Sequence, residues 1–447
     1  MTSHPLVASG SVPSSSDPLS SVRAVGLDGP FDLVVVGAGP AGCAAAIEAR
    51  REGLDVVVVD KSTFPRDKCC GDGLTTGALR HLDALGLDPT HVPSWKVIHD
   101  VHITGPDGRA RVFPLPRGRG QYAAVARRRE LDAALVDLAR VSGAVVVEAT
   151  ALEAIERCDD RIELRVGGKT VRTRYVIAAD GMWSPTRKML GLDTPGYRGE
   201  WHAFRQYYRN VSGRAAEELA VWFDADLLPG YLWSFPLADG SANVGFGIQR
   251  GRRHGIQDMK DLWTDILDRP HLRQFLGPDA VPEDRHTAWP IPARLGSSPL
   301  TSGRVFFAGD AATATDPMTG EGIGQALETG RLAASSIARA GARRPGLAAE
   351  RYEHQLRSGM VRDHAMARLL STALATRFGA TASVAVAGLT PWTRRNFARW
   401  LFEDYPRAIL ATPQRWSVDV FRQPAGYSSA DQLPQPPNRS EGVGADR

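Results

Sequence analysis

The chain has 447 residues of ordinary globular composition, with 43% hydrophobic residues, 23% charged residues, 45 glycines and 30 prolines. This usage excludes collagen, coiled coils and wholesale disorder, and the length predicts two or three domains. A net charge of +4, with acids and bases interspersed, gives no reason to expect nucleic acid as a partner. Four irregularly spaced cysteines indicate neither a disulfide framework nor a metal site.

No apolar run reaches the roughly 18–20 residues that a membrane-spanning helix needs. The first residues also lack the basic start and the apolar core of a signal peptide. We therefore expect a cytoplasmic protein, at most peripheral to the inner face of the membrane.

The N-terminal third is predicted to begin with a disordered tail, residues 1–29, rich in Ser, Pro and small residues. A short apolar strand follows at 33–36, of the kind buried in a parallel sheet. Glycines lead from it into an alanine-rich helix that continues to about residue 51. A second apolar strand, 56–59, ends at Asp60 and completes a βαβ unit of about thirty residues.

The turn between the first strand and the helix carries the pattern Gly37-x-Gly39-x-x-Gly42. Such glycines permit a tight turn, close approach of the backbone to a pyrophosphate, and close packing of helix on strand. The helix start, which includes Pro40 and Ala41, presents free N–H groups and the positive end of the helix dipole to phosphates. The pattern predicts a dinucleotide-binding turn.

An acid at the end of the second strand supports this interpretation. Asp60 follows the glycines by about twenty residues, where it can accept hydrogen bonds from the ribose hydroxyls of a dinucleotide. Lys61 lies beside it at the edge of the same predicted site. In this context we prefer dinucleotide binding to the alternative, a tight turn in an unrelated α/β protein.

The middle of the chain alternates between two kinds of pattern. Residues 61–90 are loop-like and then helical, 97–115 alternate as in a β-hairpin, and 126–144 form an amphipathic helix. Residues 197–290 are strand-rich with Trp and Tyr interleaved, which indicates a mixed sheet of their own. The strand-then-turn pattern returns at 303–312, and the chain is mostly helical after it.

Three further glycine-containing fingerprints lie at the ends of strands or the starts of helices. They are Asp180-Gly181, Gly309-Asp310, and the group Gly320, Gly322 and Ile323. Together with the glycine turn, their order resembles the p-hydroxybenzoate-hydroxylase-like flavoprotein superfamily. The resemblance implies that FAD is the cofactor, that Asp310 hydrogen-bonds its ribityl chain, and that the helix after Gly322 points at the flavin pyrimidine edge.

The same resemblance implies two more cofactor contacts. Asp180 would lie near both FAD and the docking site of NAD(P)H. Arg128 matches the superfamily's R-x-x-L position beside the FAD pyrophosphate, although Arg127 and Arg129 leave the register open by one. Because the chain has one strand-embedded G-x-G-x-x-G, we expect NAD(P)H or another electron donor to dock only transiently.

Two segments narrow the resemblance to the geranylgeranyl reductase family, which includes menaquinone reductases. FPRDKCCGDGLTTGAL resembles that family's K-x-C-G-D/G-G loop, and LPGYLWSFPLADGSANVGFG resembles its aromatic-x-W-x-F-P motif followed by G-x-G. The resemblance covers about residues 31–345. It implies that Cys70 lies near the flavin, as a proton donor or as part of the pocket wall. Asp72 is an alternative donor, or simply a turn residue.

The second motif also supports a physical argument. Tyr231, Trp233 and Phe235 alternate along a strand that ends at Pro236, so they line one face of a sheet. Such a face suits an isoprenoid chain, which offers only apolar surface. Ordinary core packing is the alternative for these aromatic residues, and a buried inert thiol is the alternative for Cys70.

We therefore predict an α/β fold in which an FAD/NAD(P)-binding Rossmann-like domain is interrupted by a mixed-sheet substrate domain and followed by a helical C-terminal cap. The predicted boundaries are 30–96, 117–195 and 291–345 for the FAD-binding domain, 97–116 and 196–290 for the substrate-binding sheet, 346–425 for the helical region, and 426–447 for a disordered tail.

Aromatic and basic residues mix near the end of the helical region. They are Trp392, Phe397, Trp400, Phe402 and Trp416, with Arg394, Arg395 and Arg399. This mixture suits a membrane interface, but we prefer the alternative, that these side chains pack onto the body of the protein.

The predicted function is an FAD-dependent reductase that saturates C=C bonds of a polyprenyl chain, either a geranylgeranyl group or the side chain of menaquinone. Flavin N5 would deliver hydride and an acid would supply the proton. The alternatives are a monooxygenase or flavin-dependent halogenase of the same fold, and a non-catalytic isoprenoid-binding protein. The chain reads GDGL where halogenases have G-E-S-L, and its intact glycines disfavour a protein that binds no flavin.

Overall fold

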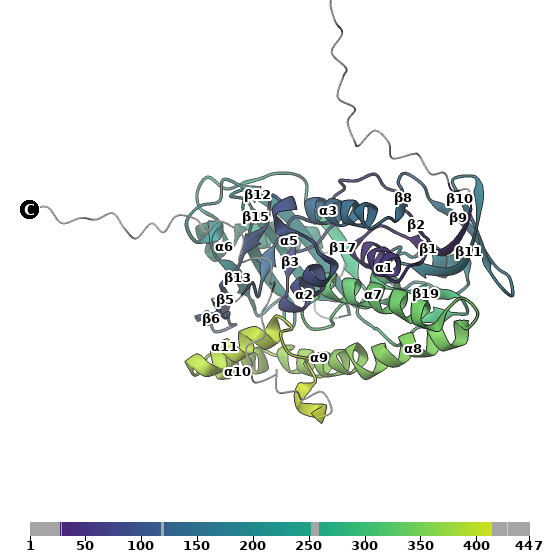
Figure 1. Cartoon of the computed structure of the whole chain (residues 1–447). Helices are drawn as coiled ribbons and strands as arrows, with labels where there is room; N and C mark the ends of the chain where they lie inside the picture. Colours follow the sequence, from purple (N-terminus) through teal and green to yellow (C-terminus); the bar gives the residue numbers. More distant parts are fainter. Residues whose placement is uncertain (1–26, 28, 118–119, 252–258, 414–426, 428–447) are drawn as a thin grey trace, which may run out of the picture.

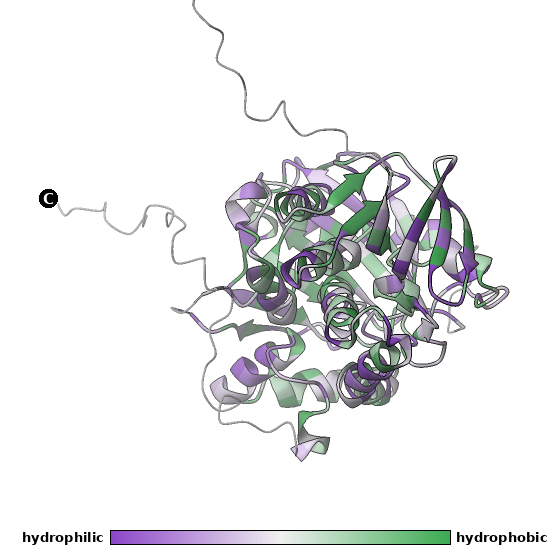
Figure 2. Ribbon diagram, turned by 45° about the vertical axis from the view of Figure 1, so that its right-hand side comes forward, coloured by the Kyte–Doolittle hydropathy of each residue, from purple (hydrophilic) through white to green (hydrophobic). Residues whose placement is uncertain are grey.

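The structure is a computed structural model that describes residues 27, 29–117, 120–251, 259–413 and 427. Two sheet-based halves lie side by side, and a layer of C-terminal helices runs along both of them (Figure 1). The hydropathy colouring of Figure 2 shows that the strands in the interior are the most hydrophobic elements.

The first half is built on an eight-stranded sheet. Its parallel core has the order β19 (Val305–Phe307), β11 (Lys169–Ala178), β1 (Pro30–Val36), β2 (Val56–Val59) and β8 (Val145–Val147). At its margins lie the antiparallel strands β18 (Thr301–Ser302), β9 (Leu152–Arg157) and β10 (Ile162–Val166). Strands β1, β2 and β19 are short and mostly apolar, because most of their side chains are buried in the core of this half.

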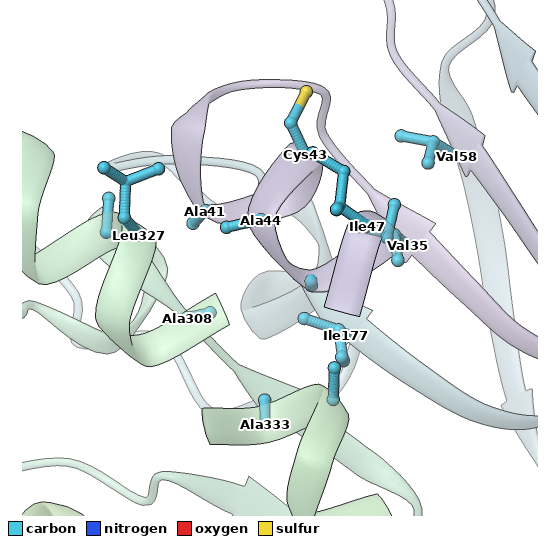
Figure 3. Packing of buried hydrophobic residues seen from close by; sticks show 14 of the residues in the cluster. Val35, Ala41, Cys43, Ala44, Ile47, Val58, Ile177, Ala308, Leu327 and Ala333 are labelled. Carbon is cyan, nitrogen blue, oxygen red and sulfur yellow. The ribbon is translucent and has the colours of Figure 1, made fainter. Parts of the chain in front are cut away.

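Helices α1 (Pro40–Arg51), α3 (Arg128–Val141) and α7 (Ile323–Ala340) belong to this half. Small side chains let α1 and α7 approach closely: a Cβ on Gly330 of α7 would lie 2.1 Å from the carbonyl oxygen of Ala41. In Figure 3, Ala41 and Ala44 face Leu327 of α7, whereas Ile47 lies beside Val35 of β1. The packing fixes the start of α1 at the carboxyl edge of the sheet.

The second half is built on another eight-stranded sheet. Its order is β16 (Val281–Pro282), β12 (Trp201–Arg209), β15 (Ala242–Gln249), β14 (Tyr231–Pro236), β13 (Leu219–Trp222), β5 (Asp100–Thr104) and β6 (Ala110–Pro114), with β17 (Thr287–Ile291) also paired to β12. The β5–β6 hairpin therefore joins this sheet through a parallel pairing with β13.

The two faces of the second sheet differ, because side chains alternate along each strand. Leu232 and Phe246 face α5 (Met259–Asp268) and α6 (Pro270–Leu276) and are buried with them in one apolar cluster. Tyr231 and Trp233 face the first half of the molecule and line a cavity between the halves. One face thus stabilises the sheet, and the other is free to bind a ligand.

Shorter elements connect the halves. A small sheet consists of β3 (Gly73–Leu74), β7 (Ala124–Val125) and β4 (Lys96–Val97). Helix α2 (Thr76–Leu85) follows β3, and α4 (Pro185–Met189) follows β11. The 3₁₀ turns are Pro89–His91, Gly213–Ala216, Gly309–Ala312 and Ile409–Ala411.

The C-terminal layer consists of α8 (Pro345–Ser358), α9 (Met360–Leu374), α10 (Arg377–Ala387) and α11 (Pro391–Leu401). Within the described residues, no helix alone has the length and apolar composition to cross a membrane. The pair formed by Pro345–Leu374 and Arg377–Ala387, bent by 113°, meets these two criteria together. Residues 402–413 form turns, and residues 414–425 of the predicted helical region lie outside the described residues.

Two residues differ from the predicted disordered tails. Leu27 is buried in the core of the first half, and Tyr427 is fully buried, with its backbone bridged to Gln121 and its ring 5.9 Å from that of Trp95. The prediction of disorder is therefore wrong at these two positions, because long-range contacts hold single apolar side chains that composition alone could not single out. Residues 1–26, 28, 426 and 428–447 of the predicted tails lie outside the described residues.

Candidate functional site

A cavity of about 760 Å³ lies between the carboxyl edge of the first sheet and the inner face of the second. The ends of parallel strands at such an edge are the usual position for ligands in α/β proteins. Among the predicted site residues that line the cavity are Gly37, Gly39, Pro40, Ala41, Asp60, Lys61, Cys70, Asp72, Arg128, Asp180, Gly181, Tyr231, Trp233, Phe235, Gly309, Asp310, Gly320, Gly322 and Ile323. Gly42 and Pro236, by contrast, do not line it.

The glycine turn has the shape that dinucleotide binding requires. Gly37 has φ of 103°, and a Cβ there would lie 2.3 Å from the carbonyl oxygen of Ala179. A Cβ on Gly42 would lie 1.8 Å from the carbonyl oxygen of Gly37, so this glycine allows α1 to pack on the turn instead of facing the cavity. No side chain caps the start of α1 at Gly39, which leaves its first N–H groups available to phosphate oxygens.

Acids and a buried arginine extend this part of the cavity. Asp60 accepts a hydrogen bond from the Ala38 N–H at 2.7 Å, which holds the carboxylate at the turn. Arg128 is buried and donates two hydrogen bonds of 2.8 Å to Asp132. Arg127 points elsewhere, into a 2.8 Å ion pair with Glu283. Of the two, Arg128 is the arginine in the cavity wall.

The start of α7 lies beside the start of α1: a Cβ on Gly309 would lie 3.0 Å from the Cβ of Ala41 and 3.5 Å from the Cβ of Ala326. Glu321 lines the cavity and accepts 3.1 Å hydrogen bonds from the N–H groups of Ile323 and Gly324. Burial, assisted by the negative charge of Glu403, raises the pKa of Glu321 to about 8. The raised pKa favours the neutral carboxyl group, which leaves the positive end of the helix dipole uncompensated by charge.

The residues present fit FAD. Besides the glycine turn, the Asp180 carboxyl offers Oδ1, a buried atom without a hydrogen-bond partner among the described residues, while Oδ2 accepts from the Thr186 N–H at 2.9 Å. A buried polar atom without a partner is costly, so such an atom in a cavity wall indicates a ligand that satisfies it. Asp310 lines the cavity in the 3₁₀ turn directly after β19, and its carboxylate is the group predicted to bind the ribityl chain.

The loop before β3 brings Asp72 into the cavity wall. Asp72 is fully buried with φ of 65°, and its Oδ2 accepts hydrogen bonds from the Tyr207 hydroxyl at 2.5 Å and the Asn243 amide at 2.8 Å. Its Oδ1 is buried without a partner among the described residues. Burial raises the pKa of Asp72 to about 6, although the charge of Arg205 and the two hydrogen bonds oppose that rise.

Cys70 lies two residues earlier and is also in the wall. Burial raises the pKa of its thiol to about 11, so the thiol is protonated at pH 7. Its sulfur accepts a hydrogen bond from the Asp72 N–H at 3.4 Å. The thiol thus supports the conformation of the loop that presents Asp72.

The three aromatic residues of β14 form one continuous wall. The rings of Tyr231 and Trp233 are 5.8 Å apart, and those of Trp233 and Phe235 are 6.1 Å apart. A Cβ on Gly245 of β15 would lie 2.3 Å from the Trp233 ring, so this glycine makes room for the indole. The Trp233 N–H donates to Asn243 at 3.0 Å, which links the wall to the Asp72 hydrogen bonds.

Sequence reasoning missed several residues of this site. Tyr207 and Asn243 lie directly opposite each other on β12 and β15, and neither belongs to a motif by itself. Tyr207 is also held between the guanidinium groups of Arg127 and Arg205, at 4.3 and 4.2 Å from the ring centre. The only sequence signal for Asn243 is that it lies two residues before Gly245 of the G-x-G motif.

Two cations in the wall were also missed. Arg66 forms a 3.1 Å ion pair with Asp132 and reaches within 3.6 Å of the Cβ position of Gly39, above the turn predicted to hold pyrophosphate. The Lys68 ammonium lies 3.5 Å from the centre of the Trp289 ring, and burial lowers its pKa to about 8. Both belong to the loop before Cys70, whose Lys and Arg residues were treated only as part of a motif.

Comparisons with known proteins agree with this geometry. The family described as FAD binding domain matches residues 31–358. A menaquinone reductase of Mycobacterium tuberculosis is 35% identical over 351 residues, covering 73% of this chain and 81% of the relative. A digeranylgeranylglycerophospholipid reductase 2 of Methanococcoides burtonii is 30% identical over 321 residues, covering 69% and 75%. The structure of a geranylgeranyl bacteriochlorophyll reductase-like protein from Thermoplasma acidophilum shares the fold, with a TM-score of 0.72 at 23% identity over 86% of this chain and 99% of that one.

Proposed function

The chain belongs to the geranylgeranyl reductase family of FAD-dependent oxidoreductases, and from that premise we propose that it saturates carbon–carbon double bonds in the polyprenyl side chain of menaquinone. One observation carries this proposal: the aromatic wall of β14 and the buried Asp72 line the same cavity as the dinucleotide turn. The arrangement places an apolar surface, an acid and a cofactor site in one cavity.

The aromatic wall determines the class of substrate. Tyr231, Trp233 and Phe235 present ring faces, and an isoprenoid chain offers no groups that need hydrogen bonds. Because the Trp233 N–H is already bonded to Asn243, the wall can contact hydrocarbon without leaving this donor unpaired. The name of the relative in Mycobacterium tuberculosis favours menaquinone within this class.

FAD bound here and reduced by the electron donor would supply the hydride, and the protein must supply the proton that completes saturation. An isolated alkene is a weak base, so its protonation needs an acid held in a site that excludes water. We assign this role to Asp72: its pKa of about 6 keeps a fraction protonated near pH 7, and its Oδ1 carries no other hydrogen bond among the described residues. The Cys70 thiol, with a pKa of about 11, is a far weaker acid.

Asn243 and Tyr207 hold the Asp72 carboxyl group in place. Both donate to Oδ2, so the proton of the neutral acid is directed to Oδ1. A proton at Oδ1 has no competing acceptor among the described residues. The hydrogen bonds therefore orient the acid as well as anchoring it.

We also propose that NAD(P)H is the electron donor and that it docks transiently. The sequence has one strand-embedded G-x-G-x-x-G, and the turn that carries it is assigned to FAD. The donor is tested by mixing the flavin-loaded protein anaerobically with NADH or NADPH and following loss of the flavin colour. We further propose that the protein works at the inner face of the membrane, where a menaquinone-type substrate resides.

The experiment that tests the function measures product mass. The flavin-loaded protein is incubated with reductant and a panel of polyprenyl compounds that includes menaquinone and geranylgeranyl lipids. A gain of about two mass units per event indicates alkene reduction, and the compound that responds identifies the substrate. An oxygen-dependent gain of about sixteen mass units would overturn the proposal in favour of a monooxygenase.

A further inference from the structure

The C-terminal helices carry an exposed group of large apolar side chains. These side chains are Leu369, Phe378, Val386, Leu389 and Trp392, whose exposed fractions are 67%, 85%, 61%, 69% and 66%. They lie on the end of α9, on α10, in the turn after it, and at the start of α11. We call them the C-terminal face. Single exposed apolar residues are normal, whereas a cluster of them in one segment indicates an interaction site.

Helix α10 is apolar on both its inner and outer sides. Its inner residues Ala380, Val384 and Ala387 are buried, and Val384 and Ala387 belong to the apolar cluster that contains the β5–β6 hairpin. Its outer side presents Phe378 and Val386. A helix that is apolar all round is ordinarily covered on every side, so the outer side of α10 is suited to a partner.

The segment that carries this face has charged side chains of one sign. Residues 364–402 contain five arginines and no aspartate or glutamate, in a chain where 50 of the 447 residues are acidic. Arg399 is buried in an ion pair with Asp404. Arg368, Arg377 and Arg395 are exposed and take part in none of the ion pairs formed among the described residues. Free positive charge beside exposed apolar side chains matches a surface of anionic lipid.

We propose that the C-terminal face docks on a membrane surface containing anionic lipids, with Phe378 and Trp392 inserted among the headgroups and the exposed arginines bound to lipid phosphates. The inference deepens the proposed function, since it names the surface from which a polyprenyl substrate would be drawn. A symmetric dimer through the same face would bring the arginines of both copies together, and this repulsion makes a second copy the poorer occupant.

Hydrogen bonds connect the end of the C-terminal face to the segment that follows the Asp72 loop. Directly after α11, the carbonyl oxygen of Phe402 accepts a 2.8 Å hydrogen bond from the Thr76 N–H at the start of α2. Glu403 accepts hydrogen bonds from Thr75 at 2.9 Å and from Gln325 of α7 at 2.7 Å. Both α2 and α7 begin beside the cavity, so docking at α10 and α11 places the cavity near the lipid surface.

The test is co-sedimentation of the flavin-loaded protein with vesicles of phosphatidylcholine alone or mixed with phosphatidylglycerol, without any polyprenyl substrate. One double variant, Phe378→Ser with Trp392→Ser, removes the aromatic insertion. A second, Arg377→Gln with Arg395→Gln, removes two charges. Val141→Ser is the matched control, because Val141 is 84% exposed at the end of α3, outside the C-terminal face.

We expect the wild-type protein to bind the mixed vesicles, and binding to weaken with added salt. The arginine variant should bind about 25-fold more weakly, since each cation contributes about fivefold at an anionic surface. The aromatic variant should bind the mixed vesicles at least about tenfold more weakly, and the control should bind like wild type. All variants should keep wild-type turnover of detergent-solubilised substrate.

Failure of wild-type protein to bind the mixed vesicles, or equal binding by the aromatic variant, would overturn the proposal. A dimer in analytical ultracentrifugation that the aromatic substitutions dissociate would also overturn it and assign the face to a second copy. Vesicle binding is measured without turnover, so its outcome does not depend on whether the proposed substrate is correct.

Discussion

Replacing Asp72 by asparagine separates its effect as a buried charge from its role as an acid. The asparagine oxygen can accept the hydrogen bonds that Oδ2 now accepts from Tyr207 and Asn243. Its amide nitrogen would occupy the position of Oδ1, facing the cavity. The variant therefore resembles the protonated acid in shape and polarity but has no proton to give.

The expected change in stability follows from the pKa. Burial raises the pKa of Asp72 from its ordinary value of 3.8 to about 6. Because the unfolded chain ionises at the lower value, the folded protein loses stability as pH rises from about 4 to 6 and keeps that loss above it. The penalty is about 2 kcal/mol at about pH 5 and about 3 kcal/mol at about pH 8. Asparagine carries none of it.

We therefore expect Asp72→Asn to unfold at a higher temperature than wild type, with a gap that widens from about pH 5 to about pH 8. Turnover should fall by about 10²–10⁴, the usual contribution of a general acid. Flavin content and the rate of flavin reduction by the donor should stay unchanged, because the donor's hydride does not require this proton.

The assay combines thermal unfolding across pH with single-turnover product formation. Cys70→Ala is the comparison. Its turnover should fall by less than about tenfold, because the thiol only supports the loop that presents Asp72. Tyr207→Phe removes a hydrogen bond that favours the ionised form, so it should move the pH at which turnover declines upward. Wild-type turnover in Asp72→Asn, or a stability gap that does not grow with pH, would refute the assignment.

Three further substitutions test the cofactor site and the packing around it. Asp310→Ala should weaken FAD binding by about 10–100-fold, measured by fluorescence titration, and retention of flavin through purification would argue against the ribityl contact. Gly42→Ala should lower the free energy of unfolding, measured by chemical denaturation, by about 3 kcal/mol or more, because its Cβ would lie 1.8 Å from the Gly37 carbonyl oxygen. Gly346→Ala is the control and should be near neutral, because nothing lies within 4 Å of its Cβ position. Burial raises the pKa of Glu321 to about 8, so wild-type stability should fall as pH rises from about 5 to 8, and Glu321→Gln should flatten this decline in calorimetry. Parallel curves for the two proteins would contradict it.

Local patterns were enough to predict the parts of the site that lie on single segments. The Gly37 turn, Asp60 and the Tyr231–Phe235 alternation are each read within a few residues, because strand and turn periodicity is a local property. The structure places all of them in one cavity wall. Fold class follows from the same periodicity, and it agrees with the family match.

The partners of Asp72 could not be predicted in this way. Tyr207 is 135 residues away and Asn243 is 171 residues away, and they meet only because β12 and β15 pair in one register. The burial of Tyr427 has the same origin, since it depends on Trp95 and Gln121. A functional group such as Asp72 can be found from its own segment of sequence. Its pKa, however, depends on residues that lie far away in the sequence and contact it only in the folded protein.

The interleaving of the two sheets has a consequence for biogenesis. In the first sheet, β11 has no partner on one side until β19 is synthesised, whose Val305 pairs with Val176. In the second sheet, the β5–β6 hairpin has no partner until β13 is synthesised. The ribosome must therefore synthesise the chain as far as Trp222 before the β5–β6 hairpin can pair with β13, and as far as Phe307 before β11 can pair with β19. Apolar strand edges stay open until then. A fragment that ends before β19 would expose an edge of β11, so we expect such a fragment to be prone to aggregation.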